Sequence, residues 1–175
     1  MELLPRHGSV VDVGTGSGAI ALSVATERPD AHVYATESST RALAYATENA
    51  RRCGATVEFF SCDLLGGLPQ RLTAAVDVVV SNPPYVPLGE RALLAPDVVA
   101  HEPHDALFSG EGGLEQISRL ARDARRWLRP GGWLVVEIGD RQGAAVRALL
   151  TTEDYGDVRV ARDYSGRERI VTARA

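Results

Sequence analysis

Short apolar runs alternate along the chain with stretches of helical spacing. Consecutive apolar residues predict buried strands, whereas apolar positions three or four apart predict amphipathic helices. We expect strands at residues 9–13, 32–37, 56–61, 76–81 and 133–138, and helices at 19–28, 39–53, 114–128 and 143–150. Strands that alternate with helices in this way predict a parallel sheet covered by helices on both faces.

The last part of the chain has a different pattern. Residues 158–162 and 169–174 flank Tyr164-Ser165-Gly166 and predict an antiparallel hairpin. The whole chain therefore predicts an α/β fold with a seven-stranded, mostly parallel sheet that ends in an antiparallel hairpin. Pro130-Gly131-Gly132 is a turn signal before the fifth strand. The long connection at 82–111 is typical of a lid or binding loop.

Composition narrows the class of protein. The chain has 175 residues, of which 45% are hydrophobic and 24% charged, as expected for one globular domain spanning 1–175. The net charge of −4 disfavours a freestanding nucleic-acid-binding protein. No apolar run approaches the ~20 residues that cross a membrane. Cys53 and Cys62 match neither a metal motif nor a disulfide framework, so we expect a reduced, cytoplasmic protein.

The long connection also holds a small cluster of polar residues. His101 and His104 lie there close to Glu102 and Asp105. Their spacing matches no standard zinc pattern, so the sequence favours a solvated loop, in which Glu102 serves as an anchor, over a metal site.

A glycine-rich turn separates the first strand from the first helix. Its residues are Gly14, Thr15, Gly16, Ser17 and Gly18. The glycines permit a tight turn and close approach of a ligand, and the start of the helix offers free N–H groups to an anion. A purely structural turn would look the same, but the strand–turn–helix context favours a nucleotide-like ligand. Spacing alone does not separate NAD from S-adenosylmethionine.

Acidic residues near the predicted strand ends refine this choice. Asp12 precedes the glycines, where it would favour a ligand ammonium group and repel a pyrophosphate. Glu37 ends the second strand and can accept hydrogen bonds from both ribose hydroxyls, although a solvated acid next to a helix also fits. Asp63 can accept from an adenine amine, with Leu64 on the ring; a loop-capping acid is the alternative.

Asn82-Pro83-Pro84-Tyr85 directly follows the fourth predicted strand. Each proline fixes its own φ and lacks an N–H, so the turn is rigid. The Asn82 amide, the Pro83 carbonyl and the Tyr85 ring can together clamp a planar –NH2 group. We therefore assign Asn82, Pro83 and Tyr85 to catalysis and all four residues to substrate binding; a rigid start of the loop is the alternative interpretation.

Six segments carry a resemblance to known proteins, at residues 11–22, 61–65, 81–87, 102–107, 128–132 and 166–171. Together they resemble the class I S-adenosylmethionine-dependent methyltransferases, which have a Rossmann-like fold. Among these the chain is most similar to the HemK/PrmC family, which methylates the side-chain amide of a glutamine in protein release factors. The glycine motif indicates the superfamily, and Asn82–Tyr85 indicates methylation of an amide or exocyclic amine. The Glu102–Leu107 and Gly166–Arg169 segments narrow it to this family.

The resemblance implies a cofactor, a substrate and a set of binding residues. The cofactor is S-adenosylmethionine, without a metal, and the expected substrate is a peptide chain release factor. The residues that match the family's cofactor site are Asp12, Gly14, Thr15, Gly16, Ser17, Gly18, Glu37, Ser38, Asp63, Leu64 and Asn82. Many members of the family have Asp at the position of Glu37.

Departures from the family leave other readings open. Bacterial members carry an N-terminal helical domain that docks the release factor, whereas only Met1–Gly8 precedes the first predicted strand here. Archaeal and eukaryotic relatives also lack that domain, and some need a small zinc-binding partner, so a small activator subunit is a further expectation. The alternatives are an adenine-N6 methyltransferase of DNA or RNA, a small-molecule N-methyltransferase, and a non-enzymatic cofactor-binding subunit or fragment.

Overall fold

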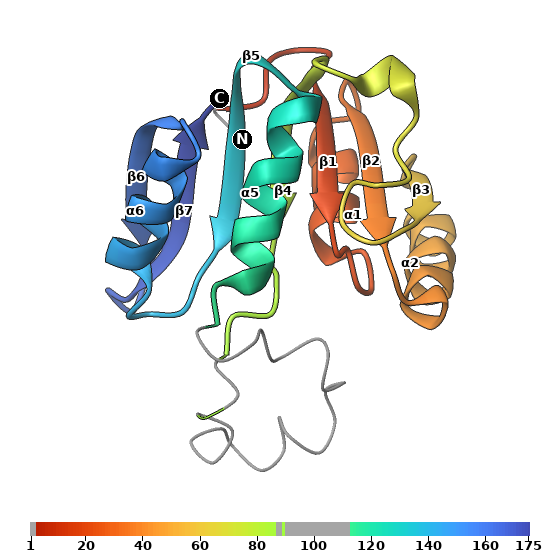
Figure 1. Cartoon of the computed structure of the whole chain (residues 1–175). Coiled ribbons are helices and arrows are strands. Elements are labelled where there is room, and N and C mark those ends of the chain that lie inside the picture. The colour runs from red at the N-terminus through yellow and green to blue at the C-terminus, as the bar shows by residue number, and fades with distance from the viewer. Residues whose placement is uncertain (1–2, 87–88, 90–112) are drawn as a thin grey trace.

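The computed structural model describes residues 3–86, 89 and 113–175, and it contains a seven-stranded sheet in the order β3-β2-β1-β4-β5-β7-β6 (Figure 1). The strands are β1 (Ser9–Val13), β2 (His32–Glu37), β3 (Glu58–Ser61), β4 (Val76–Ser81), β5 (Leu128–Glu137), β6 (Gly156–Arg162) and β7 (Glu168–Arg174). The helices are α1 (Ala19–Glu27), α2 (Thr40–Cys53), the short 3-10 helix η1 (Gln70–Leu72), α5 (Glu115–Trp127) and α6 (Gly143–Thr152).

Strands β1 to β5 pair in parallel, and β7 lies antiparallel between β5 and β6. The predicted sheet with an antiparallel C-terminal hairpin is therefore confirmed. The chain builds the sheet outward from β1 to β3 on one side and from β4 onward on the other. The neighbours β1 and β4 thus form the topological switch point, and ligands of open α/β sheets bind at the carboxyl ends of the strands at such a point.

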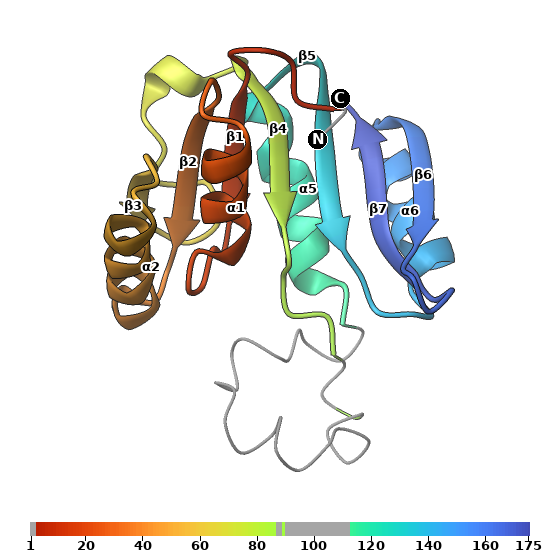
Figure 2. The ribbon, with the colours of Figure 1, turned by 180° about the vertical axis from the view of Figure 1, so that it is seen from behind.

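Helices cover both faces of the sheet, with α1 and α2 on one face and α5 and α6 on the other (Figures 1 and 2). Side chains of β1 alternate between these layers. Val10 packs in the cluster with Ala21 of α1, whereas Val13 packs in the larger cluster with Ile117 of α5 and Val146 of α6. Because neighbouring side chains of a strand point to opposite faces, this near-continuous apolar pattern is what a doubly covered strand requires.

The expected helix boundaries are largely confirmed. Ser39 caps α2 by accepting a hydrogen bond from the Ala42 N–H at 3.3 Å, and Gly54 ends the helix with φ of 63°. Helix α1 ends one residue earlier than expected, and α6 runs on to Thr152. The stripe expected on α5 included Leu114, which is only partly buried, and Leu128, which belongs to β5. The expected positions within the helix are buried, namely Ile117, Leu120, Ala121 and Ala124.

The expected turn before the fifth strand is wrong, because β5 already begins at Leu128 and includes Gly131 and Gly132. Gly131 has φ of 78°, and a Cβ on Gly132 would lie 3.0 Å from the carbonyl oxygen of Val76. The pairing of β4 with β5 is irregular between Val76 and Val78. Glycine therefore lets the chain bulge and stay paired where a larger residue would force it to turn away.

Two smaller boundaries also differ from expectation: β3 begins at Glu58 and β6 at Gly156. In the described ranges, no helix has the length and apolar character needed to cross a membrane. His101, Glu102, His104 and Asp105 lie outside the described residues, so their expected roles stay predictions.

Candidate active site

Most of the residues assigned from the sequence follow the carboxyl ends of strands β1 to β4, which all point to one edge of the sheet (Figures 1 and 2). Val13 at the end of β1 is paired with Thr36 on one side and with Ser81 on the other. The glycine turn that starts at Gly14 is therefore flanked by the residue after Thr36, which is Glu37, and by the residue after Ser81, which is Asn82.

The glycine turn is held by backbone hydrogen bonds and leaves space in front of it. Gly14, Gly16 and Gly18 have φ values of 68°, 58° and 93°, a region that favours glycine. The N–H of Gly14 donates to the carbonyl of Thr36 at 2.9 Å. A Cβ on Gly14 or Gly16 would meet no atom within 4 Å, whereas one on Gly18 would lie 3.1 Å from Leu22. The first two glycines thus border open space, and the third permits close packing of α1.

Asp12 is a buried acid beneath this turn, with an exposed fraction of 1%. A single oxygen, Oδ2, accepts from the hydroxyl of Thr15 at 2.6 Å and from the N–H of Ala21 at 3.0 Å. Burial raises the pKa of Asp12 to about 6, against the opposing effect of these hydrogen bonds, and the charge of Glu37 adds to the rise. The carboxyl group therefore joins the glycine turn to α1 and titrates near neutral pH.

Glu37 ends β2 with a buried carboxylate that reaches across to the glycine turn. Its Oε2 accepts from the N–H of Gly16 at 2.9 Å, and its Oε1 accepts from the N–H of Ser39 at 2.8 Å. The hydroxyl of Ser38 lies 3.5 Å from Oε1. These bonds fix the orientation of Glu37, and each carboxylate oxygen has capacity for a further donor such as a ribose hydroxyl.

The loop after β3 holds Asp63 and Leu64. The carboxylate of Asp63 is exposed and forms an ion pair with Arg119 of α5, a contact that the sequence did not predict. Leu64 has φ of 46°, which is uncommon for a residue other than glycine, and its side chain packs against the main core. An unusual backbone conformation often marks a functional loop. The assignment of both residues to an adenine ring stays a prediction.

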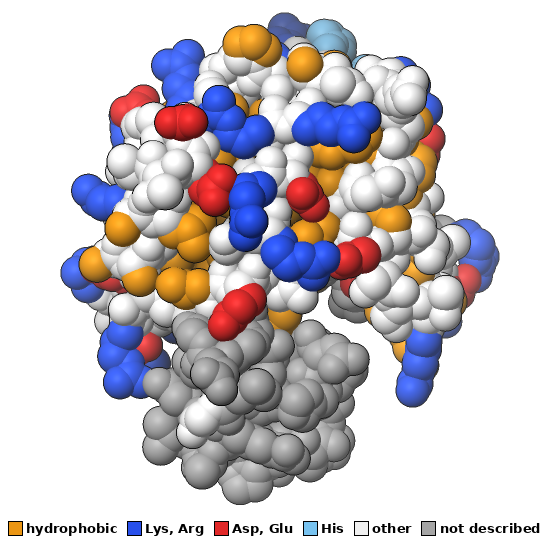
Figure 3. Space-filling model, viewed as in Figure 1, with side chains coloured by type: hydrophobic (Ala, Val, Ile, Leu, Met, Phe, Trp, Pro, Cys, Tyr) orange, Lys and Arg blue, Asp and Glu red, His pale blue; other side chains and the backbone are white. Residues whose placement is uncertain are grey.

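Arginine side chains of α5 are paired with nearby groups. Arg122 lies 3.5 Å from Glu153, and Arg125 donates to the carbonyl of Asp154 at 2.7 Å. Figure 3 shows basic and acidic side chains interspersed over the face that carries α5. This face is therefore of mixed charge.

Asn82 stands at the switch point and is exposed, whereas Pro83 behind it is buried. The Ser81 hydroxyl donates to the Val13 carbonyl at 2.7 Å and so fastens the end of β4 to the end of β1. Within the described residues, the Asn82 amide has no hydrogen-bond partner. An exposed amide on a rigid, well-anchored turn, with no partner among the residues that the structure describes, is available to a ligand.

Tyr85 is half-buried, and its hydroxyl is turned toward charged groups of the sheet. The hydroxyl lies 3.5 Å from Oε1 of Glu137 at the end of β5. Burial raises the pKa of Tyr85, and the charge of Glu137 adds to this, while Arg169 at the start of β7 acts in the opposite direction. The hydroxyl is thus engaged within the protein, and the part left for a substrate is the ring.

Gln142 is a residue that the sequence reasoning missed. It precedes α6, and its side-chain amide donates to the carbonyl of Tyr85 at 2.9 Å. No motif marks it, because its partners lie far away in the chain and a glutamine before a helix is usually a surface residue. The only signal was its position shortly after the strand that ends at Glu137.

The described part of the chain contains no group of three or more His, Cys, Asp or Glu side chains placed to hold a metal ion. Cys53 and Cys62 are both free.

Known proteins resemble this chain in sequence and in fold. The family model of the methyltransferase small domain matches residues 1–111, which is more than half of the chain. The chain belongs to this family. The fold is also that of solved methyltransferases: a methyltransferase from Pyrococcus furiosus has a TM-score of 0.73 at 21% identity, covering 97% of this chain and 76% of that one. A SAM-dependent methyltransferase from Aquifex aeolicus has a TM-score of 0.65 at 17% identity, covering 98% and 83%.

Curated relatives of this family member have a more specific name. The release factor glutamine methyltransferase of Cereibacter sphaeroides is 45% identical over 174 residues, covering 98% of this chain and 61% of the relative. That of Mycolicibacterium smegmatis is also 45% identical over 174 residues, covering 98% and 60%. These matches confirm the resemblance stated from the motifs. The chain spans about three-fifths of the length of these relatives, at 61% and 60%.

Proposed function

We propose that this chain transfers a methyl group from S-adenosylmethionine to a planar –NH2 nitrogen, and that the acceptor is the side-chain amide of a glutamine in a peptide chain release factor. The observation that carries the proposal is the position of Asn82–Tyr85, which follows the strand next to the glycine turn. The relatives named above, at 45% identity, support the choice of acceptor.

The residues at this edge fit the cofactor. Open space in front of Gly14 and Gly16 leaves room for a ligand close to the backbone, and the buried carboxyl group of Asp12 lies directly behind the turn. The residues that would hold the methionine, ribose and adenine parts are Asp12, Gly14, Thr15, Gly16, Ser17, Gly18, Glu37, Ser38, Asp63, Leu64 and Asn82. When bound, S-adenosylmethionine supplies an electrophilic methyl group on its sulfonium.

The turn at Asn82 would orient and activate the acceptor nitrogen. An amide nitrogen is a poor nucleophile because its lone pair is delocalised. The side-chain oxygen of Asn82 and the carbonyl of Pro83 would accept its two N–H bonds and stabilise positive charge as it develops. The ring of Tyr85 would pack on the amide plane, and the rest is alignment for in-line attack. The proton can leave after the transfer, so no dedicated base is required.

We infer that residues 1–175 act as one domain, that the protein works in the cytoplasm, and that the reaction needs no metal. A small activator subunit remains a predicted partner. Nucleic acid is not the favoured substrate, since the chain has a net charge of −4.

Transfer of labelled methyl from S-adenosylmethionine to a purified release factor tests the proposal. Parallel reactions use the same factor with its candidate glutamine replaced by alanine, and duplex DNA, while calorimetry measures cofactor binding. Label on the intact factor alone is the expected result. Label on the DNA would instead support an adenine-N6 methyltransferase. Cofactor binding with no transfer to either substrate would contradict the proposal and favour a cofactor-binding subunit.

A further inference from the structure

Gln142 lies where three separate elements meet. Its Nε2 donates to the carbonyl of Tyr85 after β4 at 2.9 Å and approaches the carbonyl of Gly113 before α5 at 3.4 Å. Its Oε1 accepts from the N–H of Gly139 after β5 at 2.9 Å. A half-buried side chain thus connects the turn of the candidate site to two elements of the sheet-and-helix scaffold.

These contacts match the chemistry of an unmodified glutamine. A side-chain amide offers two N–H donors and one oxygen acceptor. Here the donor end of Gln142 faces two carbonyls, and the acceptor end faces an N–H. A glutamate of the same shape would keep the acceptor for Gly139 and would point a negative oxygen at the carbonyl of Tyr85. The site therefore requires an amide at this position.

The position of Tyr85 controls that of Asn82. Pro83 and Pro84 lie between them, and two consecutive prolines leave little freedom for the chain. Tyr85 is restrained at its other end as well, since its hydroxyl lies 3.5 Å from Oε1 of Glu137. A shift of its carbonyl therefore passes through a stiff turn to the Pro83 carbonyl and the Asn82 amide.

We propose that Gln142 is a positioning residue for methyl transfer, which holds the Asn82–Tyr85 turn in its reactive geometry through the carbonyl of Tyr85. The assignment rests on the proposed function, because it concerns the same acceptor site. Within the turn, Gln142 contacts Tyr85, which is assigned to the acceptor and not to the cofactor. Asn82 is assigned to both, so loss of Gln142 is expected to lower turnover far more than cofactor affinity.

The test replaces Gln142 by Glu, with Gln70→Glu as the matched control. Gln70 is exposed on η1, ahead of β4. Its replacement by Glu therefore makes the same amide-to-carboxylate change away from the turn. We expect Gln142→Glu to lower kcat about 10- to 100-fold, as for a misplacement of about 1 Å at a reacting centre. The Kd for S-adenosylmethionine should stay within about twofold of wild type. Gln70→Glu should leave both constants unchanged.

A readout independent of activity completes the test. The protein is labelled with fluorotyrosine, and the fluorine resonance of residue 85 is assigned by its loss in Tyr85→Phe. Gln142→Glu should shift or broaden that resonance, and Gln70→Glu should leave it in place. Wild-type kcat in Gln142→Glu would overturn the inference, and so would an unchanged resonance. An inactive wild type would refute the proposed function alone, because the resonance still reports whether Gln142 holds the turn.

Discussion

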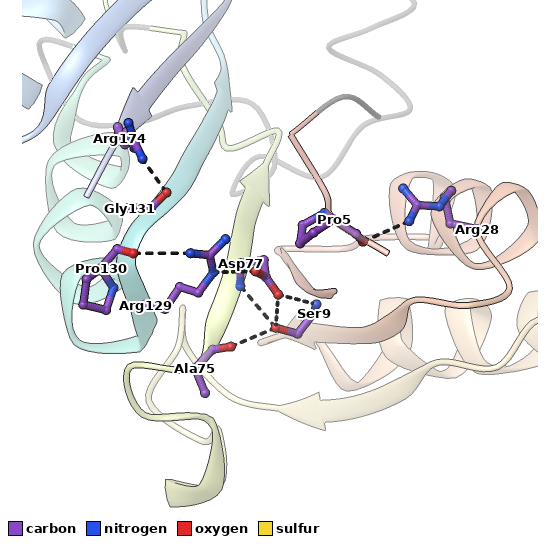
Figure 4. A network of polar contacts seen from close by, with 9 residues as sticks. All are labelled: Pro5, Ser9, Arg28, Ala75, Asp77, Arg129, Pro130, Gly131 and Arg174. Carbon is purple, nitrogen blue, oxygen red and sulfur yellow. Dashed lines mark hydrogen bonds and ion pairs between the residues drawn. The ribbon is translucent and has the colours of Figure 1, made fainter. Parts of the chain in front are cut away.

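The two edges of the sheet use polar side chains in opposite ways. At the amino ends of the strands, polar groups are satisfied by one another (Figure 4): Asp77 accepts from the N–H and hydroxyl of Ser9 at 2.8 and 3.2 Å and pairs with Arg129. At the carboxyl ends, Asn82 is exposed and has no partner within the described residues, and Asp12 is buried without a cation.

The difference shows in the pKa values of the two acids. Burial opposes ionisation of Asp77, but hydrogen bonds from Ser9 and Arg129 outweigh it, so the pKa of Asp77 is lowered. Burial dominates at Asp12, and its pKa is raised to about 6. A strongly perturbed pKa in a group near a binding edge is typical of a functional site. The polar groups at the amino ends of the strands therefore stabilise the fold, and those at the carboxyl ends can bind a ligand.

Removing the exposed Asn82 amide should give the largest effect, a loss of turnover. We expect Asn82→Ala to lower kcat by roughly 10²–10³, as when one group aimed at developing charge is lost. Because Asn82 is exposed, the free energy of unfolding should change little. Methyl-transfer kinetics and thermal unfolding of the same preparations check both statements. Wild-type turnover in this variant would remove the clamp from the mechanism.

Neutralising Asp12 should raise the stability of the protein and weaken its binding of S-adenosylmethionine. Both hydrogen bonds to Asp12 end on one oxygen, so the amide oxygen in Asp12→Asn can accept them without a buried charge. We expect a gain in unfolding free energy of roughly 1–3 kcal/mol at pH 7.5. Affinity for S-adenosylmethionine should fall about tenfold, because a charged acceptor for its ammonium is lost. Denaturant titration and calorimetry test this, and equal cofactor affinity would contradict the binding role.

The same variant has a defined pH signature. The folded pKa of Asp12 is about 6, above the unfolded value near 3.8, so the folded state binds the extra proton. The wild type should therefore lose stability as the pH rises from about 4 to 6, relative to Asp12→Asn. Asp77, with a lowered pKa, contributes stability above about 3.8 that is lost as pH falls below it. Denaturant midpoints measured across pH 3 to 8 would separate the two edges.

Breaking the Ser9–Asp77–Arg129 contacts at the amino ends of the strands should lower the free energy of unfolding and leave methyl transfer intact. Asp77→Ala leaves the Ser9 N–H and the Arg129 side chain without their acceptor, and we expect a loss of about 1–3 kcal/mol. Arg129→Ala is the matched control, and its cost should stay below about 1 kcal/mol because that side chain is 45% exposed. Neither variant should alter kcat or cofactor affinity. A large loss of turnover in Asp77→Ala would mean that the two edges are coupled.

Sequence patterns predicted the scaffold because apolar periodicity and turn residues act locally. The strands that bear the site and the cap at Ser39 follow from such local signals. Side-chain pairings across the fold do not, and the contacts Asp63–Arg119 and Gln142–Tyr85 join residues that are distant in the chain. The bulge at Gly131 was missed for a related reason. Leu128 and Trp133 on either side of it pair with β4, and the Gly131 N–H donates to the carbonyl of Ala175, which is distant in the chain.

The smallest expected effect concerns one buried hydroxyl, that of Thr36. Thr36 has an exposed fraction of 0%, and its Oγ1 is the only buried side-chain nitrogen or oxygen without a hydrogen-bond partner in the described part of the chain. It precedes Glu37 at the ligand-binding edge. Thr36→Val removes this unpaired hydroxyl at nearly constant shape, so we expect stability to stay level or rise by up to about 1 kcal/mol. Thermal unfolding measures this change. Calorimetry then decides its meaning: an unchanged Kd for S-adenosylmethionine makes the hydroxyl a defect of packing, whereas weaker binding makes it a polar group reserved for the ligand.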